Sequence, residues 1–227
     1  MMLPASTPLW AALLLMPAGL SAQATTISAP PEPSLLHMFV RPWARESALG
    51  DLVTVSMPDS ALELRFWGGF GLFGTRGLVL QRSPAGEWTA RRAVVEGCAV
   101  VRPFSEQLTP ARIDSLRRRA RESCSPDSGG GGQVIYAAWL SLYALELPPD
   151  PEAVWRDLLS AGLLTLPPRV ERTWIMNDGH TFVLELRRGH EYRASEIEYL
   201  EKPEHPADAT IRRVADVLTR YYRWDRP

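Results

Sequence analysis

The sequence predicts an α+β fold in which antiparallel β-meanders pack against helices that lie on one face. Short runs of alternating apolar and polar residues, separated by turn residues, are typical of half-buried antiparallel strands. Stretches with apolar residues every three or four positions, each preceded by a capping residue, indicate amphipathic helices. The chain has 227 residues, 45% of them hydrophobic and 22% charged, which is the composition of a globular protein.

The N-terminal segment has the features of a secretory signal peptide. An apolar run from about Leu9 to Leu20 precedes Ala22-Gln23-Ala24, which matches the A-x-A cleavage pattern, although residues 1–24 contain no Lys or Arg. The run is shorter than the about twenty apolar residues that span a bilayer. We therefore expect residues 1–24 to be removed, and the mature protein to be periplasmic or secreted with no integral membrane segment.

The mature chain is expected to form one domain. Residues 25–34 are rich in proline and predict an extended tether. Residues 35–227 then form a single α+β domain, with possible halves 35–124 and 134–227 on either side of a Gly-rich loop.

The first half contains three expected strands and one helix. Apolar and polar residues alternate in residues 61–67, 77–82 and 87–95, which predicts strands separated by turns. Thr109-Pro110 is a good capping pair for a helix that runs to about Ser123.

The second half repeats the pattern of strands followed by a helix. Residues 134–147 are apolar and aromatic, so periodicity leaves strand and helix both open. Asp150-Pro151 begins a helix that Gly162 ends. The remaining expected elements are a hairpin of residues 173–176 and 181–187 around Asn177–His180, a strand of residues 191–200 after Arg188-Gly189, and a helix of residues 207–222.

A faint internal similarity suggests two βββα-like repeats. The segments VLQRSPAGEWTA and VLELRRGHEYRA match without gaps, from Val79 with Val183 to Ala90 with Ala194. Duplication is one interpretation. Chance similarity between two amphipathic hairpins is the other, and the sequence leaves both open.

The stretch ELRFWGGFGLFGTRGLVLQR contains a G-x-G-x-x-G pattern at Gly69, Gly71 and Gly74. A dinucleotide-binding loop requires a helix directly afterwards, and here a short strand follows instead. A kinase-type loop requires a nearby strand lysine, whereas the single lysine is Lys202. The pattern therefore predicts a flexible connection between two antiparallel strands, and no cofactor is expected.

Cys98 and Cys124 are the two cysteines of the chain. Export would place them in an oxidising compartment, which favours a structural disulfide. On the chain-entropy model such a bridge contributes roughly 3 to 4 kcal/mol.

Signatures of catalysis and metal binding are weak. The histidines His37, His180, His190 and His205 form no H-x-x-x-H motif, so no metal site is expected. Glu196 and Glu198 share one face of a strand, which permits a two-carboxylate site, although a solvated strand edge is the simpler explanation and the one we prefer. We assign no catalytic residue, and the enzyme question stays open with a preference against catalysis.

An aromatic group offers a candidate interaction surface. Trp67 alternates out of phase with Leu62, Leu64 and Phe66, and Phe70 and Phe73 lie in the adjoining loop. These aromatics either form an exposed patch or are buried under the rest of the domain.

The formal net charge of −1 argues against a general preference for nucleic acid. We therefore expect an exported, non-catalytic envelope or secreted module that binds a protein or a surface polymer. A small secreted hydrolase and a carrier of a small apolar ligand are the alternatives.

Overall fold

The computed structural model describes most of the chain after residue 25, except for several segments. The described residues are 26–32, 34–70, 75–102, 109, 111, 114, 115, 118, 133–170, 180–200 and 202–224, with only the backbone described for 98–102, 133–138, 180 and 199. The expected hairpin strand 173–176 and most of the expected helix 109–123 lie outside these residues.

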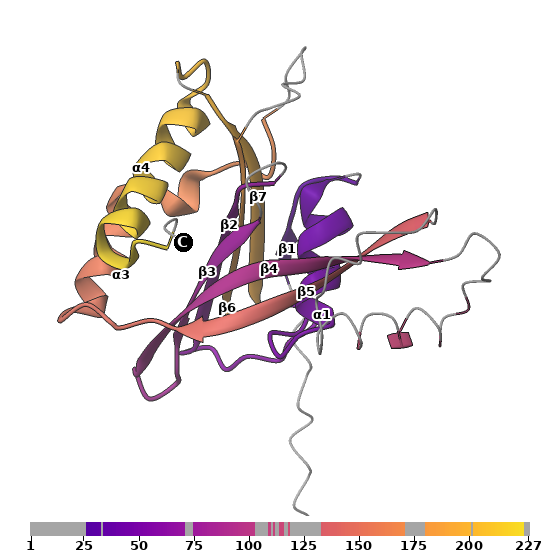
Figure 1. The fold of residues 1–227 in the computed structure, drawn as a ribbon. Helices are drawn as coiled ribbons and strands as arrows, with labels where there is room; N and C mark the ends of the chain where they lie inside the picture. The colour runs from indigo at the N-terminus through magenta and orange to yellow at the C-terminus, as the bar shows by residue number, and fades with distance from the viewer. Residues whose placement is uncertain are drawn as a thin grey trace, which may run out of the picture.

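Seven strands form one mixed sheet in the order β1-β7-β6-β2-β3-β4-β5 (Figure 1). Every neighbouring pair is antiparallel except β1 and β7, which are parallel. The strands are β1 (Thr26–Ser28), β2 (Leu62–Gly68), β3 (Arg76–Arg82), β4 (Trp88–Arg102), β5 (Gln133–Ala144), β6 (His180–Arg188) and β7 (Glu191–Tyr199). The predicted α+β class with antiparallel meanders is confirmed. β1 arises from the segment expected to be a tether.

Helices α3 (Pro151–Ser160) and α4 (Pro206–Tyr222) cover one face of the sheet (Figure 1). The side chain of Asp150 accepts a hydrogen bond from the Ala153 N–H, and His205 caps α4 in the same way. A short 3-10 helix, η2 (Leu163–Thr165), follows α3. The apolar stripes of α3 and α4 pack on the alternate apolar residues of the strands, such as Leu64 and Phe66. No described helix is long and apolar enough to cross a membrane.

A second layer, which the sequence pattern did not predict, covers the opposite face. It consists of the π-helix η1 (Leu36–Val40), helix α1 (Arg41–Arg45) and the loop that follows. We call residues 34–57 the N-terminal cover. Its buried apolar residues pack on the other side of the sheet, and the contacts include Leu36, Val40, Ala44, Leu49 and Leu52 against Trp67, Val79, Ala93 and Val183. Helical elements of five residues are too short for a 3.6-residue period to be recognised.

The ambiguous segment 134–147 is a strand, β5, and β4 continues well beyond residue 95. The two strands pair from Arg91–Ala144 to Arg102–Gln133. We call this pair the β4–β5 ribbon. One end of the ribbon extends away from α3 and α4 (Figure 1). At that end neither face of the ribbon is covered by these two helices.

The gap-free match between the two halves places matched side chains on the same face only in the first strand of each hairpin, where Leu80 and Leu184 both pack in the α3–α4 core. Trp88 and Ala90 pack with the α3–α4 core, whereas their sequence counterparts Tyr192 and Ala194 pack under the N-terminal cover. The hairpin loops differ, because β3 joins β4 through residues 83–87 while β6 joins β7 through residues 189–190. A one-residue change of register turns every side chain to the other face. Duplication itself stays a prediction.

Candidate interaction surface

Trp67 does not belong to an exposed patch. Its side chain is fully buried under the N-terminal cover, and its ring lies against Gly77, where a Cβ would come within 2.5 Å of the indole. Phe70 is half-buried against the same core, and Phe73 lies outside the described residues. The alternative of burial is therefore correct for Trp67, and a surface at Phe70 and Phe73 stays a prediction.

The Gly-rich stretch connects β2 to β3, which are adjacent antiparallel strands, as predicted. Gly69 has a φ of +77°, a conformation that glycine adopts at little cost. Gly71 and Gly74 lie outside the described residues. The described residues after this connection form strand β3, whereas a phosphate-binding loop of the dinucleotide type leads into a helix.

The cysteine prediction also stays untested. The Cys98 backbone pairs with Ala137 in the β4–β5 ribbon. Cys124 lies outside the described residues, so the disulfide remains a prediction.

Glu196 belongs to a structural contact with the N-terminal cover. One carboxylate oxygen accepts hydrogen bonds from the Leu35 N–H at 2.7 Å and the Leu36 N–H at 3.4 Å. The other accepts from Arg169 at 2.7 Å. The carboxylate therefore caps the start of η1, and it is neither solvated nor paired with Glu198 as a two-carboxylate site would require.

The three histidines whose side chains are described contact different partners. His37 contacts Ser34 and Glu32, His190 lies 3.6 Å from Asp59, and His205 caps α4. Among the described residues, no three His, Cys, Asp or Glu side chains gather in a metal-binding arrangement.

Ser34, His37 and Glu32 form the described arrangement closest to a hydrolase. The Ser34 hydroxyl oxygen lies 2.6 Å from His37 Nδ1, and His37 Nε2 lies 3.4 Å from Glu32. Ser34 is only 1% exposed, and its hydroxyl oxygen also accepts the His37 N–H at the start of η1. The hydroxyl is thus enclosed as a local helix cap, out of reach of a substrate.

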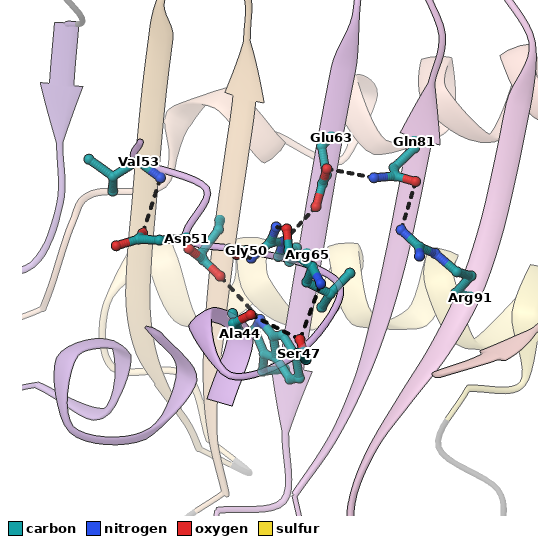
Figure 2. Close-up of polar contacts among 12 residues, drawn as sticks. Ala44, Ser47, Gly50, Asp51, Val53, Glu63, Arg65, Gln81 and Arg91 are labelled. Carbon is teal, nitrogen blue, oxygen red and sulfur yellow. Dashed lines mark hydrogen bonds and ion pairs between the residues drawn. The ribbon is translucent and has the colours of Figure 1, made fainter. Parts of the chain in front are cut away.

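Charged side chains on the covered face of the sheet bind the N-terminal cover (Figure 2). Arg65 is fully buried and donates to Glu63 at 2.6 Å, to the Gly50 carbonyl at 2.9 Å and to the Leu49 carbonyl at 3.0 Å. Asp51 in the same loop accepts hydrogen bonds from Arg41 and Arg45, which lower the pKa of its carboxyl against the effect of burial. These groups satisfy one another and fix the loop in place.

Glu185 is a second buried acid on this face. The Tyr192 hydroxyl donates to it at 3.0 Å and the Trp67 indole N–H at 3.4 Å. Burial raises the pKa of Glu185, and the nearby Arg65 charge opposes that rise. Since the carboxyl is enclosed by its donors, it supports the packing of the cover rather than facing a ligand.

The β4–β5 ribbon instead carries an ordered row of partly exposed side chains. Glu96 accepts hydrogen bonds from Trp139 Nε1 at 2.9 Å, Ser141 Oγ at 2.6 Å and the Tyr143 hydroxyl at 2.7 Å. Alternation along β5 places these three donors on one face, and we call them the aromatic row. Tyr143 is 43% exposed, and the guanidinium of Arg92 lies 5.6 Å from its ring centroid.

Hydrogen bonding in this row shifts two pKa values in opposite directions. The bonds from Ser141, Tyr143 and Trp139 lower the pKa of Glu96. The bond to Glu96 raises the pKa of Tyr143. Around neutral pH the aromatic row therefore consists of three neutral donors, and these hold the ionised carboxylate of Glu96 in place.

A cavity of about 350 Å³ lies next to the aromatic row, between β5 and the N-terminal cover. Residues 43–48 of the N-terminal cover form one wall and the strand forms the other. Its lining is Trp43, Glu46, Ser47, Ala48, Trp139, Leu140 and Leu142. We call it the Trp43 cavity.

The outer edge of β5 is unpaired within the described part of the chain. The Leu145 N–H donates to the Ala90 carbonyl at 2.9 Å. Since alternate residues of an antiparallel strand point their main-chain groups to the same side, Leu145, Tyr143 and Ser141 bond to β4. The N–H and C=O groups of Leu140, Leu142 and Ala144 therefore point outward, beside the Trp43 cavity.

This surface was missed because the sequence left residues 134–147 between strand and helix. Taken as a strand, the alternation of Trp139, Ser141 and Tyr143 is visible in the sequence. The contribution of Trp43 carries no comparable signal, since it depends on how the cover folds back.

Comparisons with known proteins give no relative, since no family model, no curated protein and no solved structure matches this chain.

Proposed function

We propose that this protein is an exported, non-catalytic module that binds a macromolecular partner through the β4–β5 ribbon. The observation that supports the proposal is the position of the aromatic row next to the Trp43 cavity, on an edge strand whose outer edge is unpaired within the described residues. Aromatic side chains with ordered polar partners are enriched where proteins bind one another.

The charges of the ribbon suit recognition more than chemistry. Glu96 is held by three donors, and the hydroxyl of Ser141 is committed to it at 2.6 Å. The row has no described histidine or second carboxylate to act as a base or an acid. A partner would thus meet a rigid surface whose polar groups are already oriented.

Export is part of the proposal and is supported by the sequence of residues 1–24. The intact mass of protein from the cells that produce it tests this directly. Loss of residues 1–24 is the expected result, and a full-length mass would contradict export.

Site-directed photo-crosslinking tests the binding proposal. A benzophenone amino acid at Tyr143 should give a crosslinked adduct in the producing cells. The matched control is the same probe at Leu159, which is 38% exposed on α3 and does not belong to the ribbon. Adducts at neither position, or in equal amounts at both, would contradict the ribbon as the binding surface.

The same experiment separates a protein partner from a surface polymer. A protein adduct is shifted by a discrete mass and disappears with protease treatment of the crosslinked partner. A polymer adduct runs as a smear that protease does not remove.

The alternatives have less support. A hydrolase that used Ser34 would have to expose its hydroxyl, and an activated fluorophosphonate probe would then label that residue. A carrier of an apolar ligand needs a cavity between the sheet and the helices, and the cavity lined by Trp155, Leu164 and Leu186 there measures about 50 Å³. That volume is well below the about 300 Å³ at which ligand pockets begin.

A further inference from the structure

We infer that the partner binds as an added β-strand: an extended, apolar segment of another protein pairs with the outer edge of β5 and places a large side chain in the Trp43 cavity. The inference rests on the proposed function, because it names the chemistry of the partner at that same ribbon.

Main-chain chemistry is the first argument. Leu140, Leu142 and Ala144 present N–H and C=O groups outward in pairs that repeat about every 7 Å along an extended strand. An extended polypeptide has the complementary groups at the same spacing. Sugars and lipid headgroups lack that regular alternation of donors and acceptors.

The composition of β5 is the second argument. Edge strands of soluble proteins are usually protected by lysine, proline or inward-pointing charge. The β5 sequence QVIYAAWLSLYA contains no charged residue, no proline and no glycine. A strand of this kind is suited to pairing, and the ladder leaves its outer edge available within the described residues.

The Trp43 cavity supplies side-chain selectivity. Leu140 and Leu142 line it from β5, and Trp43 lines it from the cover. Successive side chains of an added strand point to opposite faces. Those on one face would therefore enter the Trp43 cavity, while those on the other would extend the aromatic row beside Tyr143.

A second copy of this chain fits the edge less well than a separate segment. Each copy would bring a β5 whose Leu140 and Leu142 already face their own Trp43 across their own cavity. Pairing two such strands would leave both cavities unfilled. A separate extended segment has free side chains to fill one.

A proline at position 144 isolates the main-chain contribution. The Ala144 N–H points away from β4, and its side chain is exposed. Ala144→Pro therefore removes an edge donor and blocks pairing without removing a β4–β5 hydrogen bond. Ala144→Val is the matched control, because it keeps the N–H and suits a strand.

With the benzophenone probe at Tyr143, we expect about tenfold less protein adduct in the Ala144→Pro variant than in Ala144→Val. Adduct retained in Ala144→Pro would overturn strand addition while leaving the ribbon as a binding surface. An adduct with the mass of two copies of the chain would overturn the assignment to another protein. No adduct in the parent protein would overturn the proposed function together with this inference.

A second measurement keeps the inference testable if Ala144→Pro does not fold. Short random peptides displayed on phage are selected against the mature protein, and amide hydrogen exchange is then followed with and without a selected peptide. Strand addition predicts slower exchange at the outward Leu142 and Ala144 amides and little change at the Ser141 and Tyr143 amides, which already face β4. Uniform protection, or none, would overturn it.

Discussion

Replacing Arg65 by methionine tests whether buried charge holds the N-terminal cover on the sheet (Figure 2). The guanidinium is fully enclosed and makes three hydrogen bonds, one to Glu63 and two to the carbonyls of Leu49 and Gly50. Methionine has a similar length but no donor. The change therefore leaves the Glu63 carboxylate, 4% exposed, without its cationic partner and with a hydrogen bond from the neutral Gln81 amide at 2.6 Å.

The expected cost is large because a buried charge loses its partner. Removing one member of a buried ion pair typically lowers the free energy of unfolding by about 3–5 kcal/mol. For a chain of this size, 1 kcal/mol corresponds to a change of about 2–4 °C in the melting temperature, so a decrease of about 6–20 °C is expected. A double variant with both Arg65→Met and Glu63→Gln should recover part of the lost free energy of unfolding, because a glutamine at position 63 has no charge to bury without a partner.

Urea and thermal unfolding followed by circular dichroism provide the measurement. The control is Arg91→Met, since Arg91 donates to Gln81 at the half-buried end of the same chain of hydrogen bonds. Amide exchange should also accelerate in residues 49–53 of the Arg65 variant alone. A loss below about 1 kcal/mol, or one equal to that of Arg91→Met, would refute the assignment of Arg65 as the anchor of the cover.

Three further predictions concern titration and oxidation. Because the pKa of Glu185 is raised, the folded state keeps a proton that the unfolded state has released. The free energy of unfolding should therefore fall as pH rises above the ordinary carboxyl range. Glu185→Gln should flatten this dependence in urea unfolding between about pH 5 and 8. Glu96→Gln should lower the pKa of Tyr143 toward its ordinary value in an ultraviolet titration, and an unchanged titration would contradict the hydrogen bond between them. Denatured, unreduced secreted protein should contain no free thiol, whereas two free thiols would exclude a bridge between Cys98 and Cys124.

Much of the sheet and both long helices could be predicted from the sequence. In LELRFWG, the residues Leu62, Leu64 and Phe66 alternate with polar neighbours, and one face of β2 does bury those three in the α3–α4 core. Helices α3 and α4 follow capping residues and carry continuous apolar stripes. These signals are local, so a pattern within a few residues is sufficient to find them.

The environment of the second face could not be predicted in the same way. Alternation suggests that Glu63 and Arg65 face solvent, as on a one-sided antiparallel sheet. The cover instead encloses them, and Arg65 binds two backbone carbonyl groups of the cover. Because every residue has such a carbonyl, the sequence contains no signal that identifies these partners. The candidate site was missed for the same reason, since Trp43 reaches β5 only when the cover is folded.

The buried charges and the proposed binding surface are physically connected through this cover. Ser47 and Ala48 line the Trp43 cavity, and the next two residues, Leu49 and Gly50, are those whose carbonyls Arg65 binds. The wall of the cavity that faces β5 is therefore positioned by a guanidinium on the opposite side of the loop. Loosening that anchor should weaken partner binding even though Arg65 lies outside the cavity lining. Arg65→Met should accordingly reduce the Tyr143 adduct while the protein is still folded, and Arg91→Met should not, which would distinguish an anchored cavity wall from a cover that serves stability alone.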